Sequence, residues 1–161
     1  MRRLSTAVIA GLLLVGLIAA PASAEKPLRG TIDQVLVGGD CTFAGPITFG
    51  DDTYGMAFFN AGEPKIVGNS YHFSETWTIY AETFAGCPDE EAVVAWGYDW
   101  GVVNLRNMKG VGNGQVEGVT PGNDPHGLFT ESLIGSNVHW NGFNSFEGDD
   151  FLFDATFRIN S

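Results

Sequence analysis

Glu75 is the residue whose position most directly suggests chemistry. Residues 71–84 alternate between two faces, and Glu75 falls on the apolar face between Phe73 and Trp77. Burying an unpaired carboxylate costs several kcal/mol, so we expect Glu75 to be paired, protonated or turned towards a cavity. Arg106, on another expected strand, is a possible partner, and the two could act as acid–base catalyst and charge stabiliser. The alternatives are a structural salt bridge, or a β-bulge that lets Glu75 face water.

A row of aromatic residues in segment 92–100 is the second candidate site. Trp96, Tyr98 and Trp100 recur at every second position, about 7 Å apart on a strand, and Trp140 adds a further flat ring. Rings accompanied by a few polar groups are typical of small-molecule sites, and planar rings also stack on sugars. The polar residues expected to accompany the rings are Asn104, Asn141, Asn144 and Asp99. The alternative is that the rings belong to the core, each with one polar edge hydrogen-bonded.

The other chemistry-bearing residues match no known site spacing. Three histidines are far apart and lack the H-x-H or H-E-x-x-H spacing of zinc sites: His72, His126 and His139. Acidic runs at 51–52, 89–91 and 149–150 do not fit an EF-hand loop, and we expect them to be solvated turns. The glycine cluster Gly110–Gly118 does not fit G-x-G-x-x-G, and we interpret it as a hairpin turn. We therefore expect no metal site and no cofactor.

The first 24 residues have the three parts of a secretion signal. Arg2 and Arg3 form a positive start, residues 6–20 are an uncharged apolar run, and Ala22-Ser23-Ala24 is a small-x-small cleavage site. The apolar run is shorter than the roughly 20 residues needed to span a bilayer, so we expect cleavage after Ala24 rather than an anchor. The predicted location is secreted, periplasmic or otherwise extracytoplasmic, with no stable membrane insertion after cleavage.

The remaining residues, 25–161, are expected to form one acidic domain. The whole chain has 8 basic and 19 acidic residues and a formal net charge of −11, and loss of Arg2 and Arg3 makes the exported part more acidic still. Such a charge repels phosphate backbones, so nucleic acid is not an expected partner. The chain also contains two cysteines, Cys41 and Cys87, and an even number favours a disulfide in an oxidising compartment.

Strands dominate the expected secondary structure. No apolar pattern with a helical period is sustained, glycine interrupts the chain every few residues, and alternation with period two is frequent. The clearest alternation is at the C-terminus, where one face carries Phe151, Phe153, Ala155, Phe157 and Ile159. Further strands are expected at 30–37, 54–60, 71–84, 92–100, 102–108, 115–119, 127–134 and 137–140. This number of strands predicts an all-β fold, either an antiparallel β-barrel of about eight strands or a two-sheet β-sandwich.

No motif is specific enough to assign the chain to a family. In strand number and size alone, the expected architecture is similar to lipocalin-like and allene-oxide-cyclase-like barrels, although the G-x-W signature of the first lipocalin strand is absent. Similarity of fold does not give function.

Three functional hypotheses remain. The first is an exported non-catalytic domain that binds a small apolar or carbohydrate-like ligand. The second is a small barrel enzyme, an isomerase or hydrolase that uses Glu75, for which Glu117 or Glu131 could supply the second acid of a glycoside hydrolase. The third is an envelope or matrix protein that acts through protein contacts.

Overall fold

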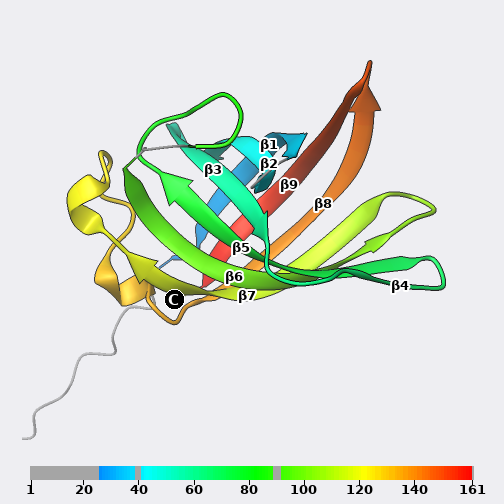
Figure 1. Cartoon of the computed structure of the whole chain (residues 1–161). Coiled ribbons are helices and arrows are strands. Elements are labelled where there is room, and N and C mark those ends of the chain that lie inside the picture. Colours follow the sequence, from blue (N-terminus) through cyan, green and yellow to red (C-terminus); the bar gives the residue numbers. More distant parts are fainter. Residues whose placement is uncertain (1–25, 39–40, 89–91, 161) are drawn as a thin grey trace, which may run out of the picture.

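The computed structural model describes residues 26–38, 41–88 and 92–160, which form an antiparallel β-barrel (Figure 1). The expected signal segment 1–24 and the acidic run 89–91 lie outside the described residues. The strands are β1 (Leu28–Gly38), β2 (Cys41–Phe49), β3 (Asp52–Asn60), β4 (Lys65–Val67), β5 (Ser70–Tyr80), β6 (Val93–Asn104), β7 (Lys109–Val119), β8 (Asn137–Glu147) and β9 (Asp150–Asn160). Two short 3-10 helices, η1 (Pro121–Asn123) and η2 (Glu131–Leu133), lie between β7 and β8. No helix within the described ranges is long and apolar enough to cross a membrane.

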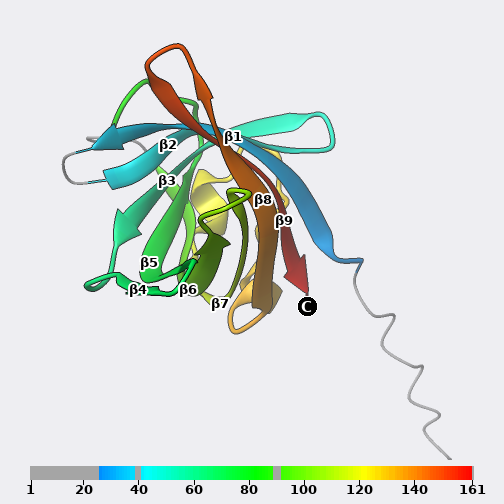
Figure 2. The same cartoon turned by 90° about the vertical axis from the view of Figure 1, so that its right-hand side faces the viewer.

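The sheet closes on itself. Its order is β3-β2-β1-β9-β8-β7-β6-β5-β4, and an additional pairing of β3 with β5 completes a ring of eight strands. The short strand β4 pairs with β5 outside this ring. Figure 2 shows the strands as a ring with the loop that carries η1 and η2 behind it. The structure therefore selects the barrel from the two predicted architectures, and closure removes the unpaired edges that a sandwich would leave.

Period-two alternation places one face of each strand in the barrel interior. On β9, Phe153, Phe157 and Ile159 are buried, whereas Thr156 and Arg158 between them are exposed, as the sequence predicts. The predicted apolar face of β5 also points inward, with Trp77 and the other core residues of that strand. The faces of β5 and β9 that the alternation singled out therefore line the barrel interior.

The prediction that the glycine cluster forms a hairpin turn is wrong. Gly110, Gly112 and Gly114 lie within β7 and point inward. A Cβ atom at Gly112 would collide with the indole of Trp140, and one at Gly114 would collide with the backbone around Asp99. These glycines therefore leave room for side chains of the neighbouring strands rather than supplying turn geometry.

Two further predicted strands are also corrected. Strand β6 ends at Asn104, and residues 105–108 of the predicted strand 102–108 form the turn to β7, with Met108 in the left-handed region at φ 57°. The predicted strand at 127–134 is instead part of the loop that contains η2. The alternation in 127–134 reflects the burial of Phe129 and Leu133 against the core rather than a strand.

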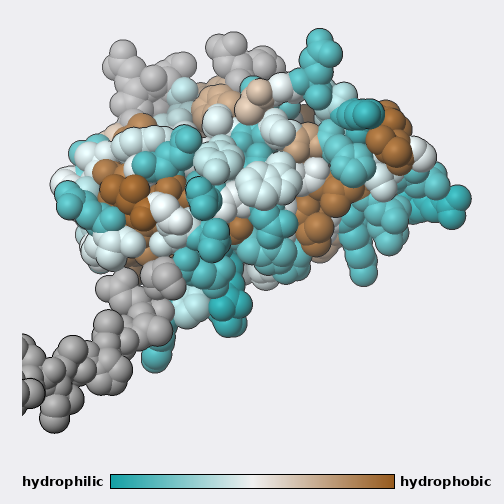
Figure 3. Space-filling view, turned by 90° about the horizontal axis from the view of Figure 1, so that it is seen from below, coloured by the Kyte–Doolittle hydropathy of each residue, from teal (hydrophilic) through white to brown (hydrophobic). Residues whose placement is uncertain are grey.

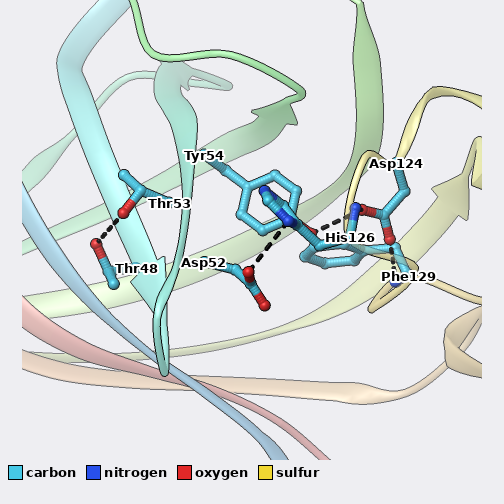
Figure 4. Close-up of polar contacts among 7 residues, drawn as sticks. All are labelled: Thr48, Asp52, Thr53, Tyr54, Asp124, His126 and Phe129. Atoms are coloured by element: carbon cyan, nitrogen blue, oxygen red, sulfur yellow. Dashed lines mark hydrogen bonds and ion pairs between the residues drawn. The ribbon is translucent and has the colours of Figure 1, made fainter.

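The β7–β8 loop closes one end of the barrel. Its Phe129 is buried and packs edge-on against the rings of Phe49 and Tyr54, with centroid distances of 5.5 and 5.4 Å. The carboxylate of Asp124 accepts hydrogen bonds from the Tyr54 hydroxyl at 2.7 Å and from the Phe129 backbone N–H at 2.6 Å (Figure 4). Burial opposes ionisation of Asp124, but its hydrogen bonds outweigh this effect and lower its pKa. His126, whose Nδ1 lies 3.1 Å from a carboxylate oxygen of Asp52, adds a polar contact between the loop and β3.

A disulfide fastens a second loop to the outside of the barrel. Cys41 at the start of β2 is bonded to Cys87 in the β5–β6 loop, which confirms the predicted pairing. The loop residue Phe84 packs edge-on against Tyr80, and together with Ala44 they belong to a small apolar cluster outside the main core. The disulfide thus holds the β5–β6 loop against the barrel wall and does not enter the lumen.

Candidate functional site

The end of the barrel opposite the β7–β8 loop contains a cavity of about 280 Å³. The ring-bearing residues of its wall are Phe43, Tyr71, Phe73, Trp140, Phe151 and Phe153. Leu36, near the β1–β2 hairpin, and Leu105, in the β6–β7 turn, also line it, and both are more than 40 % exposed. The cavity therefore opens to solvent between these two hairpins, while the other end of the barrel is sealed.

Trp140 is the central ring of the cavity wall. It stacks on Phe73 with a centroid distance of 6.0 Å and an interplanar angle of 21°, and it meets Phe153 edge-on at 5.2 Å. Gly101 of β6 and Gly112 of β7 lie against the same indole, where any side chain would displace it. The glycines thus determine where the Trp140 ring lies and how much of the lumen stays open.

Two acidic side chains lie together beside this ring. Glu75 of β5 lines the cavity and is 6 % exposed, and the strand register places Asp99 of β6 directly opposite it. Asp99 is 1 % exposed, and its Oδ2 accepts a hydrogen bond of 2.8 Å from Trp140 Nε1. Two carboxylates cannot donate to each other, so with both ionised Asp99 Oδ1 has no donor in the described part of the chain. Protonation of either group allows the hydrogen bond between Glu75 and Asp99.

Burial controls the protonation of this pair. It raises the pKa of Asp99 to about 7, against the opposing hydrogen bonds from Trp140 and Glu75. For Glu75, burial first and the negative charge of Asp99 second raise the pKa well above its ordinary value. Two neighbouring desolvated carboxyl groups cannot both ionise at low cost. The pair therefore retains at least one proton at neutral pH.

The predicted pairing of Glu75 with Arg106 does not form. Because β6 ends before it, Arg106 lies in the exposed β6–β7 turn, where its guanidinium group neighbours the side-chain amide of Asn69. The bulge that would turn Glu75 to water is also absent, since the β5–β6 register is regular at Glu75. The group beside Glu75 is the carboxyl group of Asp99, whereas the predicted neighbour was the positively charged Arg106.

The predicted aromatic site is divided between two surfaces. Trp96 and Trp100 are 38 % and 52 % exposed on the outer face of β6, and Tyr98 lies between them, with its ring 6.1 Å from that of Trp100. Trp140 is 1 % exposed and lines the lumen. Of the polar residues expected with the rings, Asn144 lines the cavity and Asp99 points inward, whereas Asn104 and Asn141 are exposed.

The underside of the barrel carries no continuous apolar surface. Figure 3 shows this face, on which hydrophobic side chains form separate patches among hydrophilic ones. The outer rings have polar neighbours, since the Tyr98 hydroxyl donates to Gln115 Oε1 at 3.1 Å. The lumen is therefore the more enclosed of the two aromatic surfaces.

The sequence groups Asp99 with the polar residues expected to accompany the tryptophans, but Asp99 lies on the opposite face of β6. The face of β6 opposite the tryptophans carries Gly97, Asp99, Gly101 and Val103, so it is small and apolar apart from one carboxyl group. This is the same signal that singled out Glu75, and it was available from the sequence. The aromatic residues at alternate positions obscured this signal, because a row of rings suggests that its own face of the strand, and not the opposite face, points into the core.

No group of three or more His, Cys, Asp or Glu side chains in the described ranges is arranged to hold a metal ion. No protein-family model, curated protein or solved structure matches the chain. The function of the cavity is therefore inferred from its own residues.

Proposed function

We propose that the protein binds a small, largely apolar ligand in the open end of the barrel without converting it chemically. The observation that carries this proposal is the cavity of about 280 Å³, walled by aromatic and aliphatic side chains with few polar groups. Small-molecule sites typically have this composition. A dry apolar cavity of about 150 Å³ holds benzene, so a cavity of this size suits a ligand of about eleven non-hydrogen atoms. Because so few polar groups face the lumen, the wall favours an apolar ligand over a carbohydrate-like one.

We place this activity outside the cytoplasm. The predicted leader at residues 1–24 supports export, and the Cys41–Cys87 disulfide is typical of proteins from oxidising compartments. The sealed end and the covalently fastened β5–β6 loop suit a rigid, preformed container. Preformed sites bind with less loss of conformational entropy than sites that must be ordered by the ligand.

Filling the cavity tests the proposal. Val103 is 7 % exposed and lines the cavity, so Val103→Phe would place a ring in the space that the ligand needs. The matched control is Val111→Phe on β7, where the wild-type side chain is 43 % exposed on the outer surface. We expect isothermal titration calorimetry with 4-phenylbutan-1-ol to detect binding to wild type and to the control, and at least about tenfold weaker binding to Val103→Phe. Equal affinity for all three proteins would show that the ligand does not enter the lumen.

A second candidate function shares the same cavity. Glu75 and Asp99 hold a proton beside an apolar wall, an arrangement suited to a general acid or base in a small barrel isomerase or hydrolase. In this second function Asp99, and not the predicted Arg106, is the ionisable neighbour of Glu75. In this version the ligand leaves the protein chemically changed, and Glu75→Gln abolishes its turnover. Recovery of the bound molecule unchanged after prolonged incubation favours the binding protein.

A further inference from the structure

We infer that the natural ligand is a small apolar amine, bound as its cation with the ammonium group on the Glu75–Asp99 pair. This inference rests on the proposed function and specifies the chemical class of the ligand. The hydrocarbon part would occupy the aromatic lumen, and the ammonium group would lie at the wall where β5 and β6 meet.

The acid pair lacks a positive partner within the protein. None of the residues that line the cavity, within the described ranges, is a Lys, Arg or His. The residue of β3 opposite Glu75 is Asn60, β8 contributes the neutral indole of Trp140, and the inward residues of β7 opposite the pair are glycines. Tyr71 is the other ionisable side chain of the lining, and it is neutral when protonated. A ligand cation is therefore the missing counter-charge for the carboxyl group that ionises.

The geometry of the pair suits an ammonium group. Asp99 is held in place by Trp140 Nε1, and Glu75 presents its carboxyl group to the cavity. An alkylammonium ion has three donors and no acceptor, so it matches a site that offers carboxyl oxygens and contains no cationic side chain among the lining residues that the structure describes.

Other ligand classes fit the pair less well. A neutral alcohol can exchange one hydrogen bond with a carboxyl group but leaves the negative charge uncompensated. A carboxylate ligand would bring a third acidic group into a desolvated site and would be repelled. The overall acidity of the chain, with a formal net charge of −11, acts in the same direction by attracting cations and repelling anions.

Three probes with the same carbon skeleton test the inference: 4-phenylbutylamine, 4-phenylbutan-1-ol and 4-phenylbutanoate. Each has about eleven or twelve non-hydrogen atoms, which matches the cavity. By calorimetry at pH 8, we expect the amine to bind wild type at least about tenfold more tightly than the alcohol, and the carboxylate to bind most weakly. The preference for the amine should decrease from pH 8 to pH 5, because the pair then takes up protons.

Conservative variants assign the effect to the pair. The double variant Glu75→Gln/Asp99→Asn removes both carboxyl groups and should bring the Kd of the amine to within about threefold of that of the alcohol, whereas a single variant keeps one carboxyl group that can ionise and pair with the ammonium group. The matched control is Glu117→Gln, which removes an exposed acid from the outer face of β7 and should keep the preference. Circular dichroism establishes that each variant is folded. If the double variant does not fold, the wild-type pH profile decides the question.

The outcomes separate this inference from the proposed function. If amine and alcohol bind wild type equally, or the preference persists in the double variant and at pH 5, the amine inference is refuted while lumen binding stands. If none of the three probes binds wild type, the proposed function itself is refuted. A preference that is lost in the double variant and weakens on acidification supports the inference.

Discussion

Asp99→Asn is expected to make the stability of the protein less dependent on pH. In the folded state burial raises the pKa of Asp99 from an ordinary value of 3.8 to about 7. Between these values the native state holds a proton that the unfolded state has released, so the free energy of unfolding falls as pH rises. This stabilising contribution is complete below the unfolded pKa and is lost once the pH exceeds about 7.

The size of the effect follows from the pKa. About two pH units separate pH 5 from the folded pKa, and each corresponds to 1.36 kcal/mol, so wild type should lose about 3 kcal/mol from Asp99 between pH 5 and pH 8. The asparagine variant does not titrate here, and its amide can still accept from Trp140 and donate to Glu75. The difference in free energy of unfolding between variant and wild type should therefore shift by about 3 kcal/mol in favour of the variant over this range.

Urea unfolding of both proteins at half-unit steps from pH 5 to pH 8 measures this difference. Comparing the two proteins removes the contributions of groups whose titration Asp99 does not affect, which leaves Asp99 and its neighbour Glu75. Asp51→Asn, in the exposed β2–β3 turn, is the matched control and should follow wild type at every pH. Parallel pH profiles for Asp99→Asn and wild type would refute the reasoning, because they would mean that Asp99 neither gains nor loses a proton between pH 5 and pH 8.

Two further predictions concern the parts that enclose the cavity. Cys41→Ser removes the disulfide to Cys87, whose two cysteines are 46 residues apart. On the chain-entropy model this should lower the free energy of unfolding by about 4 kcal/mol, which urea unfolding measures. An unchanged urea midpoint would contradict this prediction. Tyr54→Phe removes a hydrogen bond that lowers the pKa of Asp124 and should cost about 1–3 kcal/mol at pH 7. A lowered pKa stabilises the fold only while Asp124 is ionised, so the loss of stability that Tyr54→Phe causes in thermal melts should shrink as the pH falls through the folded pKa of Asp124. A loss that stays constant with pH would show that the hydrogen bond does not depend on the charge of Asp124.

The strands that could be predicted best are those whose alternation is carried by large side chains. In β9 the phenylalanines at every second position identify the inward face, and in β5 the same holds around Trp77. Burial of a large apolar side chain is a strong local signal, because its free energy does not depend on which strand lies next to it. The disulfide was equally predictable, since Cys41 and Cys87 are the two cysteines of the chain.

Strand β7 shows what local signals miss. Its glycines alternate as regularly as the phenylalanines of β9, but a glycine carries no information about burial, and several together favour a turn. Their role is defined by Trp140, which is distant in sequence and fills the space above Gly112. The identity of the partner of Glu75 is non-local in the same way, since it depends on the register between β5 and β6.

The two ends of the barrel treat their acidic side chains in opposite ways, and this contrast bears on function. At the closed end, Asp124 receives donors from Tyr54 and from the backbone, so its charge is stabilised and fastens a loop. At the open end, the Trp140 indole donates to Asp99 and Glu75 lines an apolar cavity, so burial opposes the ionisation of both carboxyl groups.

Buried acids without a counter-charge weaken a fold, and apolar residues of similar volume would often stabilise it. The barrel closes through backbone pairing that needs neither carboxyl group. Glu75 and Asp99 are therefore best explained by what enters the cavity, and a cation is the ligand that would turn this destabilising pair into a favourable interaction.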